Sequence, residues 1–302
     1  MQQAVDLGYV KYNFSDAVNS DSLASMQLFV TGSTGKVGSR AVRHLAEKGH
    51  KLRVLVREDS QAGEARQRGW DAVQGDLSAP NSLQSAISGV DAAVHIAAFF
   101  RGATPEQMKV INETGTVELA KAALRANVKR FVYTSTGLVY GEGHGHASLE
   151  TDGGEPRQPY PQTKLAAEKG ISLLKEDGLD PRILRLSFVY GDGDSHLSDW
   201  LPRLRELPGN RRVQMVHHLD VCQAIELAVS SENEGTYNVA DNELLTVDEV
   251  FRSLKVSGGK ASEPLSEQQK WEGIMDCRKI REELAFRPRF PSLREAILRG
   301  AL

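Results

Sequence analysis

Tyr160 and Lys164 are four residues apart in a segment with helical spacing, so both side chains can point at one ligand. A free phenol has a pKa of about 10, which is too high for a base at neutral pH. A neighbouring ammonium and a positive charge on a bound ligand would favour the phenolate. Thr136 follows an apolar run and can donate to a substrate oxygen as negative charge develops there. These residue types predict acid–base chemistry at a carbon–oxygen centre.

A glycine-rich turn connects the first predicted strand to the first predicted helix, with the sequence Thr31-Gly32-Ser33-Thr34-Gly35-Lys36-Val37-Gly38. Gly32 allows the tight turn, Gly35 lets a pyrophosphate approach the backbone, and Gly38 lets the helix press on the sheet. The helix N-terminus then faces the phosphate charge. The turn therefore predicts a dinucleotide site that uses Gly32, Thr34, Gly35, Lys36, Val37 and Gly38.

Arg57 ends the second predicted strand, where an NAD site usually has Asp or Glu to bind the ribose 2′-hydroxyl. An arginine can hold a 2′-phosphate instead, and Lys36 and Arg40 add positive charge nearby. We expect NADP as the preferred cofactor and NAD as the alternative, in which Arg57 is a solvated loop residue. Asp76 and Leu77 follow the third strand, where the carboxylate can accept from the adenine amino group or belong to a common turn.

The fourth predicted strand ends in His95-Ile96-Ala97-Ala98. The small side chains of Ala97 and Ala98 leave room for the cofactor backbone. His95 is interpreted as a core histidine rather than a catalyst. Lys164 can also hold the ribose hydroxyls, so it and Tyr160 belong to the cofactor-binding set as well.

The elements that position these residues alternate between short apolar runs and helical runs from Met26 onwards, which predicts a parallel sheet wrapped by helices. Strands buried on both faces of such a sheet are nearly all apolar. Between 105 and 127, apolar residues recur every three or four positions, which predicts one helix packed on the sheet. The predicted strands are 27–31, 52–56, 72–74, 92–96, 130–134 and 182–186.

A smaller lobe is expected after residue 190, where a Gly- and Asp-rich loop precedes a strand at 213–216. A helix at 221–229 and a strand at 236–239 are expected to return to the sheet. Thr246 and Glu249 have capping-box spacing before another helix. We predict a dinucleotide-binding domain over 26–190, with 214–241 returning to it, and a substrate-binding lobe over 191–213 and 242–302. Residues 1–25 are interpreted as an N-terminal extension.

The order of these parts is similar to that of the extended short-chain dehydrogenase/reductase superfamily, the group that includes the NAD-dependent epimerase/dehydratase family. After the glycine turn comes Asn112 on the long helix, in the run Asn112-Glu113-Thr114-Gly115-Thr116, then Thr136 at a strand end, then Tyr160 with Lys164. The runs 131–141, 185–191, 217–221 and 276–288 add to the likeness, which covers the chain from Met26 to its last residue.

This resemblance implies an α/β fold with a doubly wound parallel Rossmann sheet and a small C-terminal α/β lobe. It also implies that Thr136, Tyr160 and Lys164 form the catalytic set together with Asn112, with the tyrosine as acid or base. Proteins of this superfamily are usually homodimers, and the helices that hold Asn112 and Tyr160 would form the interface.

Departures from the family pattern bear on the reaction. Dehydratases have Asp-Glu directly after the residue that matches Thr136, and this chain has Gly137-Leu138, which disfavours dehydration. Phe188 stands where sugar-nucleotide epimerases usually have Asn, which indicates an apolar or smaller substrate. We expect an NAD(P)-dependent oxidoreductase that interconverts a carbonyl and an alcohol. A nucleotide-sugar epimerase is the alternative, and a non-catalytic NADP sensor is less favoured.

Charged and histidine residues outside these motifs suggest where the substrate is selected. Specificity is expected from three loops, 99–104, 142–159 and 191–210. Arg211 and Arg212 are interpreted as solvated surface charges, with anion binding as the alternative. His144 and His146 lack further ligands at metal-binding spacing, so we interpret their loop as a mobile lid and predict no metal site.

The composition is typical of a globular enzyme of 302 residues, with 40% hydrophobic and 25% charged residues. A formal net charge of -3 gives no broad electrostatic reason to expect nucleic acid or an anionic membrane as partner. No apolar run approaches the roughly 20 residues needed to cross a bilayer. Cys222 and Cys277 match no zinc motif and are expected to be thiols in a reducing compartment. We expect a cytoplasmic protein with a small-molecule substrate.

Overall fold

The computed structural model describes residues 25–79 and 83–302, so the predicted N-terminal extension, apart from Ser25, lies outside the described residues. Its centre is a seven-stranded sheet in the order β10-β6-β5-β4-β1-β2-β3, with every pair parallel. This order confirms the doubly wound α/β fold. The strands are β1 (Gln27–Thr31), β2 (Lys51–Val56), β3 (Asp71–Gln74), β4 (Ala92–His95), β5 (Arg130–Thr136), β6 (Asp180–Leu186) and β10 (Gly235–Val239).

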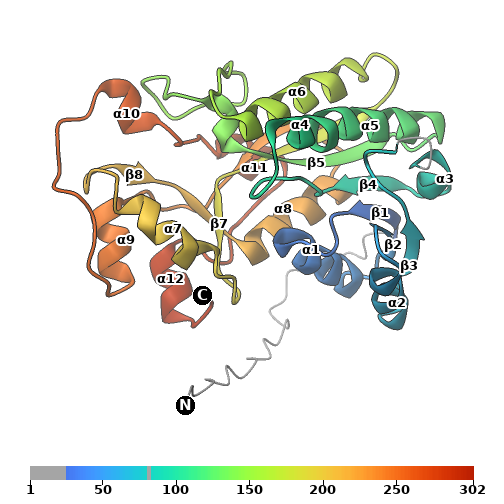
Figure 1. Ribbon diagram of the computed structural model, residues 1–302, viewed down its shortest axis with the longest axis horizontal. Coiled ribbons are helices and arrows are strands. Elements are labelled where there is room, and N and C mark those ends of the chain that lie inside the picture. Colours follow the sequence, from blue (N-terminus) through green and yellow to red (C-terminus); the bar gives the residue numbers. More distant parts are fainter. Residues whose placement is uncertain (1–24, 80–82) are drawn as a thin grey trace.

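Helices cover both faces of the sheet, which is why its strands are apolar on both sides (Figure 1). Along β1, Leu28 and Val30 pack on one face, and Phe29 packs on the other. The first face carries α1 (Lys36–Glu47), α2 (Asp59–Gln67), α8 (His218–Ser230) and α11 (Arg278–Glu283). The second face carries α3 (Leu83–Ile87), α5 (Thr116–Arg125) and α6 (Pro159–Leu173).

The long helix predicted over 105–127 is interrupted. It consists of α4 (Pro105–Met108), the π-helix η2 (Lys109–Gly115) and α5. A Cβ at Gly115 would lie 2.8 Å from the carbonyl oxygen of Leu77, so the π segment passes very close to the loop after β3. Single-turn π segments of this kind occur frequently at functional sites.

The second lobe contains two small sheets and its own hydrophobic core. In these sheets β7 (Phe188–Tyr190) pairs with β9 (Met215–His217), and β8 (Arg212–Val213) pairs with β11 (Leu245–Thr246). Its helices are α7 (His196–Leu204), α9 (Val247–Ser253), α10 (Glu267–Trp271) and α12 (Leu293–Leu298). Tyr190, Leu204 and Phe251 belong to the core of this lobe.

Two boundaries differ from the sequence-based prediction. The strand expected over 213–216 is split into β8 and β9 at Gln214, whose side-chain amide bonds both the N–H and the carbonyl oxygen of Met275. In addition, α11 packs with Ile280 against the large sheet, although its sequence was assigned to the small lobe. The capping box of Thr246 and Glu249 at the start of α9 is confirmed. Within residues 25–79 and 83–302, every helix is too short or too polar to cross a membrane.

Candidate active site

A cleft of about 880 Å³ lies where the strand order reverses, outside the carboxyl ends of β1 and β4. Ligands of open α/β sheets bind in this crevice because the crossover helices on either side of it leave to opposite faces. The structure brings all but one of the predicted site residues to this cleft. They are Gly32, Thr34, Gly35, Lys36, Val37, Gly38, Arg57, Asp76, Leu77, Ala97, Ala98, Thr136, Tyr160 and Lys164.

The glycine turn is compact because backbone atoms occupy the space of the missing side chains. Gly32 has a φ of +77°, and a Cβ there would lie 2.6 Å from the backbone nitrogen of Ala97. A Cβ at Gly38 would lie 1.9 Å from the carbonyl oxygen of Gly32, so Gly38 packs against the turn itself rather than against the sheet. Gly35 is the N-cap of α1 and provides no side-chain cap, which leaves the first N–H groups of this helix for an anion.

Lys36 and Arg40 are both paired with carboxylates from the loop that follows β7. The ammonium of Lys36 bonds the carboxylate of Asp194, and Nε of Arg40 donates to Oδ2 of Asp192 at 2.7 Å. The positive charge that we expected these two residues to add near Arg57, in support of a 2′-phosphate, is therefore largely compensated. Asp194 also accepts from Nε2 of His218 at 2.8 Å, so this loop links the start of α1 to the start of α8.

Arg57 differs from these two cations. Its guanidinium lies 5.8 Å from the ring centroid of Phe99, and no carboxylate of the described residues forms an ion pair with it. Oδ1 of Asp76 accepts from the backbone N–H and the hydroxyl of Ser78, at 2.7 Å each. Asp76 thus belongs to a turn, which was the alternative to adenine binding predicted for this residue. These two hydrogen bonds lower the pKa of Asp76, so it is a carboxylate at neutral pH.

Thr136, Tyr160 and Lys164 come together from two elements. Thr136 ends β5, and Tyr160 and Lys164 lie one turn apart near the start of α6. The ammonium of Lys164 is buried and donates to the carbonyl oxygen of Thr134 at 2.6 Å. The ring of Tyr160 packs against Phe100, with ring centroids 4.4 Å apart.

Burial is the main cause of the pKa shifts of Tyr160 and Lys164. It raises the pKa of Tyr160 to about 12 and lowers the pKa of Lys164 to about 7, and the carboxylate of Glu168 opposes the second shift. The expectation that the ammonium makes the phenol more acidic is therefore wrong for the protein by itself, because desolvation of the phenolate outweighs the attraction. At neutral pH the phenol carries its proton, so it is ready to donate one.

Asn112 is the predicted site residue that does not line the cleft. It is fully buried in η2, where its side chain accepts from the N–H of Phe99 and donates to the carbonyl oxygen of Phe99, both at 2.7 Å. It also donates to Oγ1 of Thr163 at 3.3 Å. Its contacts therefore connect the loop after β4 to α6. His95 is a core residue as expected, bonded to Thr31 and Thr116.

A family model described as NAD dependent epimerase/dehydratase matches residues 28–240, from β1 to just beyond β10. The chain belongs to the NAD-dependent epimerase/dehydratase family. The resemblance to the extended short-chain dehydrogenase/reductases is thereby confirmed, and the protein is a member of a family of enzymes. Its cleft and glycine turn lie within the matched residues.

Curated relatives of this family member include reductases. It is 28% identical over 214 residues to a 4-hydroxy-2-methyl-3-oxo-4-farnesyl-3,4-dihydroquinoline-1-oxide ketoreductase of Stigmatella aurantiaca, which covers 67% of this chain and 64% of the relative. It is 31% identical over 198 residues to a 2-alkyl-3-oxoalkanoate reductase of Stenotrophomonas maltophilia, with 63% and 58% covered. The chain thus spans less than two thirds of the length of each of these relatives.

Solved structures of the family match over nearly the whole chain. A dTDP-glucose 4,6-dehydratase of Streptomyces venezuelae with bound NAD is 26% identical and gives a TM-score of 0.74 over 91% of this chain and 95% of the dehydratase. A UDP-glucose 4-epimerase of Thermotoga maritima gives a TM-score of 0.73 at 24% identity, over 89% and 96%, which shows a common fold.

Gly137, the residue directly after Thr136, packs closely against a methionine side chain. A Cβ at Gly137 would lie 2.6 Å from the sulfur of Met275, so an aspartate there would require Met275 to move. The glycine is therefore part of the packing between the end of β5 and the second lobe.

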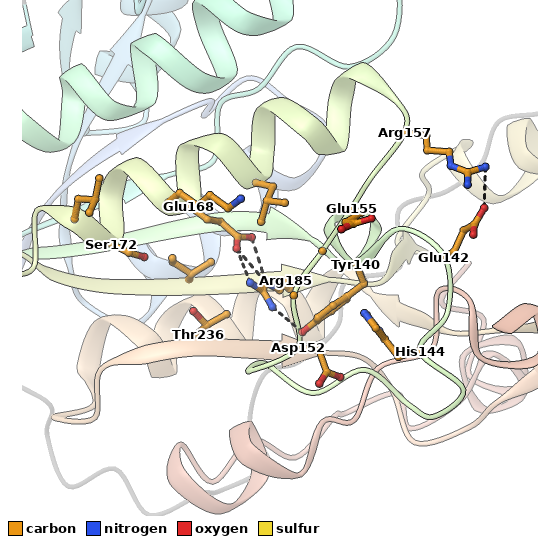
Figure 2. A pocket seen from close by; sticks show the side chains of 16 residues that line it. Tyr140, Glu142, His144, Asp152, Glu155, Arg157, Glu168, Ser172, Arg185 and Thr236 are labelled. Atoms are coloured by element: carbon orange, nitrogen blue, oxygen red, sulfur yellow. Dashed lines mark hydrogen bonds and ion pairs between the residues drawn. The ribbon is translucent and has the colours of Figure 1, made fainter. Parts of the chain in front are cut away.

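A buried network behind the cleft was missed in the sequence. Oε2 of Glu168 accepts from Nη2 of Arg185 at 2.7 Å (Figure 2). Oε1 of the same carboxylate accepts from the hydroxyl of Ser135. Arg185 also donates to the hydroxyl of Tyr140 at 2.8 Å, and that hydroxyl donates to Asn238 at 2.7 Å. The spacing of Glu168 four residues after Lys164 could have indicated it, because residues four apart share a helical face.

This network forms part of the wall of a second cavity of about 1020 Å³ on the other side of β5 and β6. The loop 142–159, in which we expected specificity residues, lines this second cavity rather than the cleft. His144 bonds the hydroxyl of Ser148 at 3.1 Å. In the part of the chain that the structure describes, no group of three or more side chains of His, Cys, Asp or Glu could hold a metal.

The far end of the cleft is built by the second lobe. Phe188 lies between Trp200 and His196, with ring centroids 3.9 and 4.4 Å away. Arg211, which we interpreted as a solvated surface charge, is a cleft residue with 13% of its side chain exposed, and it pairs with Glu272 at 2.6 Å.

Two further predictions concern the end of the cleft that is formed by the second lobe. Arg212 also lines the cleft and lies over the ring of Trp271, 4.2 Å from its centroid, so it is not a surface charge either. Glu272 and Gly273 line the cleft from the segment predicted as part of the substrate-binding lobe, although they lie outside the three predicted specificity loops.

Proposed function

We propose that the protein is an NADP-dependent oxidoreductase that interconverts a carbonyl and an alcohol on an apolar small molecule. The observation that carries this proposal is that Tyr160, Lys164 and Thr136 share one cleft with the glycine turn. The similarity to a ketoreductase and a 2-alkyl-3-oxoalkanoate reductase supports the reaction type. The aromatic far end of the cleft supports an apolar substrate.

The residues of the turn fit a dinucleotide, since Gly32 and Gly38 leave no side chain on its inner surface and the N-terminus of α1 is uncapped. When bound, the cofactor supplies the hydride donor or acceptor. Ala97 and Ala98 would lie along it, and Lys164 would hold its ribose hydroxyls. Residues 191–213 and 242–302 would form the substrate-binding part, with α11 as an exception.

In this proposal Tyr160 donates its phenolic proton to the carbonyl oxygen as negative charge develops there. The hydroxyl of Thr136 donates a hydrogen bond to the same oxygen. The ammonium of Lys164 stabilises the phenolate that remains, because it lies one helical turn away and is shielded from water. Asn112 acts indirectly by holding the loop with Phe99, so we propose it as a positioning residue rather than a member of the reacting group.

NADP is the proposed cofactor because Arg57 follows β2, where a 2′-phosphate would lie, and none of the described carboxylates forms an ion pair with it, Asp76 acting on it only at longer range. Michaelis constants measured with NADPH and NADH test this point. A lower constant for NADPH is expected, and a clear preference for NADH would contradict the assignment.

A nucleotide-sugar epimerase is the second candidate, favoured by the arginines at positions 211 and 212 in the cleft. It predicts that UDP-sugars interconvert without net change in nicotinamide absorbance. The side chain of Phe188 opposes it, since an apolar ring leaves sugar hydroxyls without hydrogen-bond partners.

We also propose a homodimer that uses α5 and α6 together with η2. The apolar side chains of Val110 on η2 and Leu173 at the end of α6 are 45% and 73% exposed, and a partner would cover them. A cytoplasmic location remains a prediction, supported by the free, buried thiols of Cys222 and Cys277.

The Tyr160→Phe variant tests the proposed reaction. It removes the proton donor without changing the ring, so kcat is expected to fall by about 10²–10⁴-fold while the cofactor binds with unchanged affinity. Carbonyl reduction followed by nicotinamide absorbance and cofactor titration by fluorescence measure the two quantities. Full turnover in this variant would contradict the proposed role of the phenol.

A further inference from the structure

One face of α7 points into the cleft. His196, Trp200 and Arg203, with Leu207 just beyond the end of the helix, all line it, and their spacing of four, three and four residues places them on one side of a helix. Along this face, aromatic rings come first and a guanidinium follows. The order provides an apolar region next to a positively charged one.

The apolar region shares the cleft with the proposed proton donor. Phe100 packs on the ring of Tyr160, and Leu138, two residues after Thr136, is 51% exposed at the cleft. Phe188 and Trp200 line the same cleft and are stacked on each other, with ring planes 18° apart. A carbonyl compound bound here would therefore place carbon, and not hydroxyl groups, against these walls, because buried hydroxyls without partners cost binding energy.

Among the described residues, two guanidiniums of the positively charged region have no acidic partner, those of Arg203 and Arg212, but Arg212 is already held by the carbonyl oxygen of Lys270 and lies over the ring of Trp271. Arg101 and Arg211 pair with Asp199 and Glu272, respectively. Among residues 25–79 and 83–302, no carboxylate forms an ion pair with Arg203, although Arg203 lines the cleft. A guanidinium at such a site can bind a carboxylate through two parallel hydrogen bonds.

We propose that the substrate is a ketone or aldehyde with an apolar, ring-sized body and a carboxylate at its far end, and that Arg203 binds this carboxylate. The proposal rests on the proposed oxidoreductase function and adds the substrate class and a specificity-determining residue. Phe188 and Trp200 contact the apolar body, and the guanidinium of Arg203 selects acids over their neutral esters.

The test uses phenyl ketones whose side chains end in a carboxylate at varied distance from the carbonyl, each compared with its methyl ester. For the acid that the wild-type protein reduces best, Arg203→Gln is expected to raise KM roughly tenfold and to leave kcat nearly unchanged. KM for the matching ester should not change. Arg205→Gln is the matched control, because Arg205 directly follows the last residue of α7 but lies over the ring of Phe251 rather than in the cleft.

Thermal-shift measurements on the cofactor-loaded protein separate the two proposals. If neither acid nor ester is reduced, the proposed reaction fails, yet stabilisation by the acid alone that is lost in Arg203→Gln would still support carboxylate binding. Equal effects of the substitution on acid and ester would contradict the role of Arg203. Stabilisation by UDP-glucose that depends on Arg203, with no response to the acids, would overturn the proposal and assign the guanidinium to a diphosphate.

Discussion

At the scale of single residues, the charge of Lys164 depends on Glu168. Burial alone would lower the pKa of the ammonium, and the carboxylate one turn later on α6 opposes this effect. The same carboxylate accepts from Ser135, which lies between the two β5 residues that matter at the cleft, Thr134 and Thr136. Glu168 therefore acts as a positioning residue that connects the lysine, the strand end and the buried Arg185.

Replacing Glu168 by Gln should shift the pH dependence of kcat/KM. Without the carboxylate the pKa of Lys164 falls below its value of about 7, so the ammonium is lost at lower pH. We expect the alkaline limb of the profile to move to lower pH, which a loss of packing alone would not produce. The measurement is kcat/KM between mildly acidic and mildly alkaline pH.

Two controls accompany this experiment. Glu168→Gln leaves the guanidinium of Arg185 without its acid, so thermal denaturation must show that the variant is folded at the assay temperature. Ser135→Ala removes one hydrogen bond to the same carboxylate but keeps its charge. An unshifted limb in Glu168→Gln, or an equal shift in Ser135→Ala, would show that the charge of Glu168 is not what matters.

At the scale of elements, η2 positions the loop that carries Phe99 and Phe100. The side chain of Asn112 bonds both polar backbone groups of Phe99. These are the groups that a neighbouring strand would bond if the loop were part of a sheet. Phe100 in turn packs against Tyr160 on α6. The π segment thus determines where an aromatic wall of the cleft stands, although Asn112 itself does not reach the cleft.

Asn112→Ala should weaken substrate binding more than cofactor binding. It leaves two partly buried backbone groups of Phe99 without their side-chain partner, which costs up to about 1–3 kcal/mol for each group and favours other loop conformations. We expect KM for the carbonyl substrate to rise by about tenfold or more, with a smaller change in cofactor affinity. Asn233→Ala, which removes a bond to the carbonyl oxygen of Glu283 instead, should leave both constants unchanged. An equal loss of cofactor affinity in Asn112→Ala would argue against the loop as the mediator.

At the scale of the whole molecule, the two lobes are joined by polar contacts at the ends of the strands. Asp194 connects α1 and α8 to the loop after β7, and Asp241, just after β10, donates its N–H to the carbonyl oxygen of Met215 in β9. Asp241 is buried, and burial raises its pKa to about 8. Burial also raises the pKa of Asp220 to about 6.

This buried acid makes the folded protein less stable as pH rises. The pKa of Asp241 changes from 3.8, its ordinary value, to about 8 on folding, so between about pH 4 and pH 8 the unfolded chain releases a proton that the folded protein keeps. The contribution of this group to stability is therefore highest below about pH 4 and is lost towards pH 8. Asp220 acts in the same direction over a narrower range.

Asp241→Asn should remove this dependence. We expect Tm at pH 8 to rise by about 2–4 °C relative to the wild type, and the difference to shrink towards pH 4. Differential scanning calorimetry across this range measures both. Asp177→Asn, on the exposed turn after α6, is the control and should leave the slope unchanged. The same decline of Tm with pH in Asp241→Asn and wild type would contradict the assignment.

The sequence by itself determined the parts that depend on neighbouring residues. Apolar runs predicted the six strands of the first domain to within two residues. The glycine spacing predicted the turn between β1 and α1. Helical spacing put Tyr160 and Lys164 on one face of α6. Local conformation and burial follow a periodic pattern, so these features could be derived without a tertiary structure.

Only the tertiary structure decided which groups share an environment. Lys36 is neutralised by Asp194, 158 residues later in the chain, and Arg211 is paired in the cleft rather than on the surface. The side chain of Asn112 bonds Phe99 and does not line the cleft. Burial raises the pKa of Tyr160, whereas we expected the neighbouring ammonium to lower it. Ion pairing and desolvation depend on which segments pack together in space, and the spacing of residues along the chain does not contain that information.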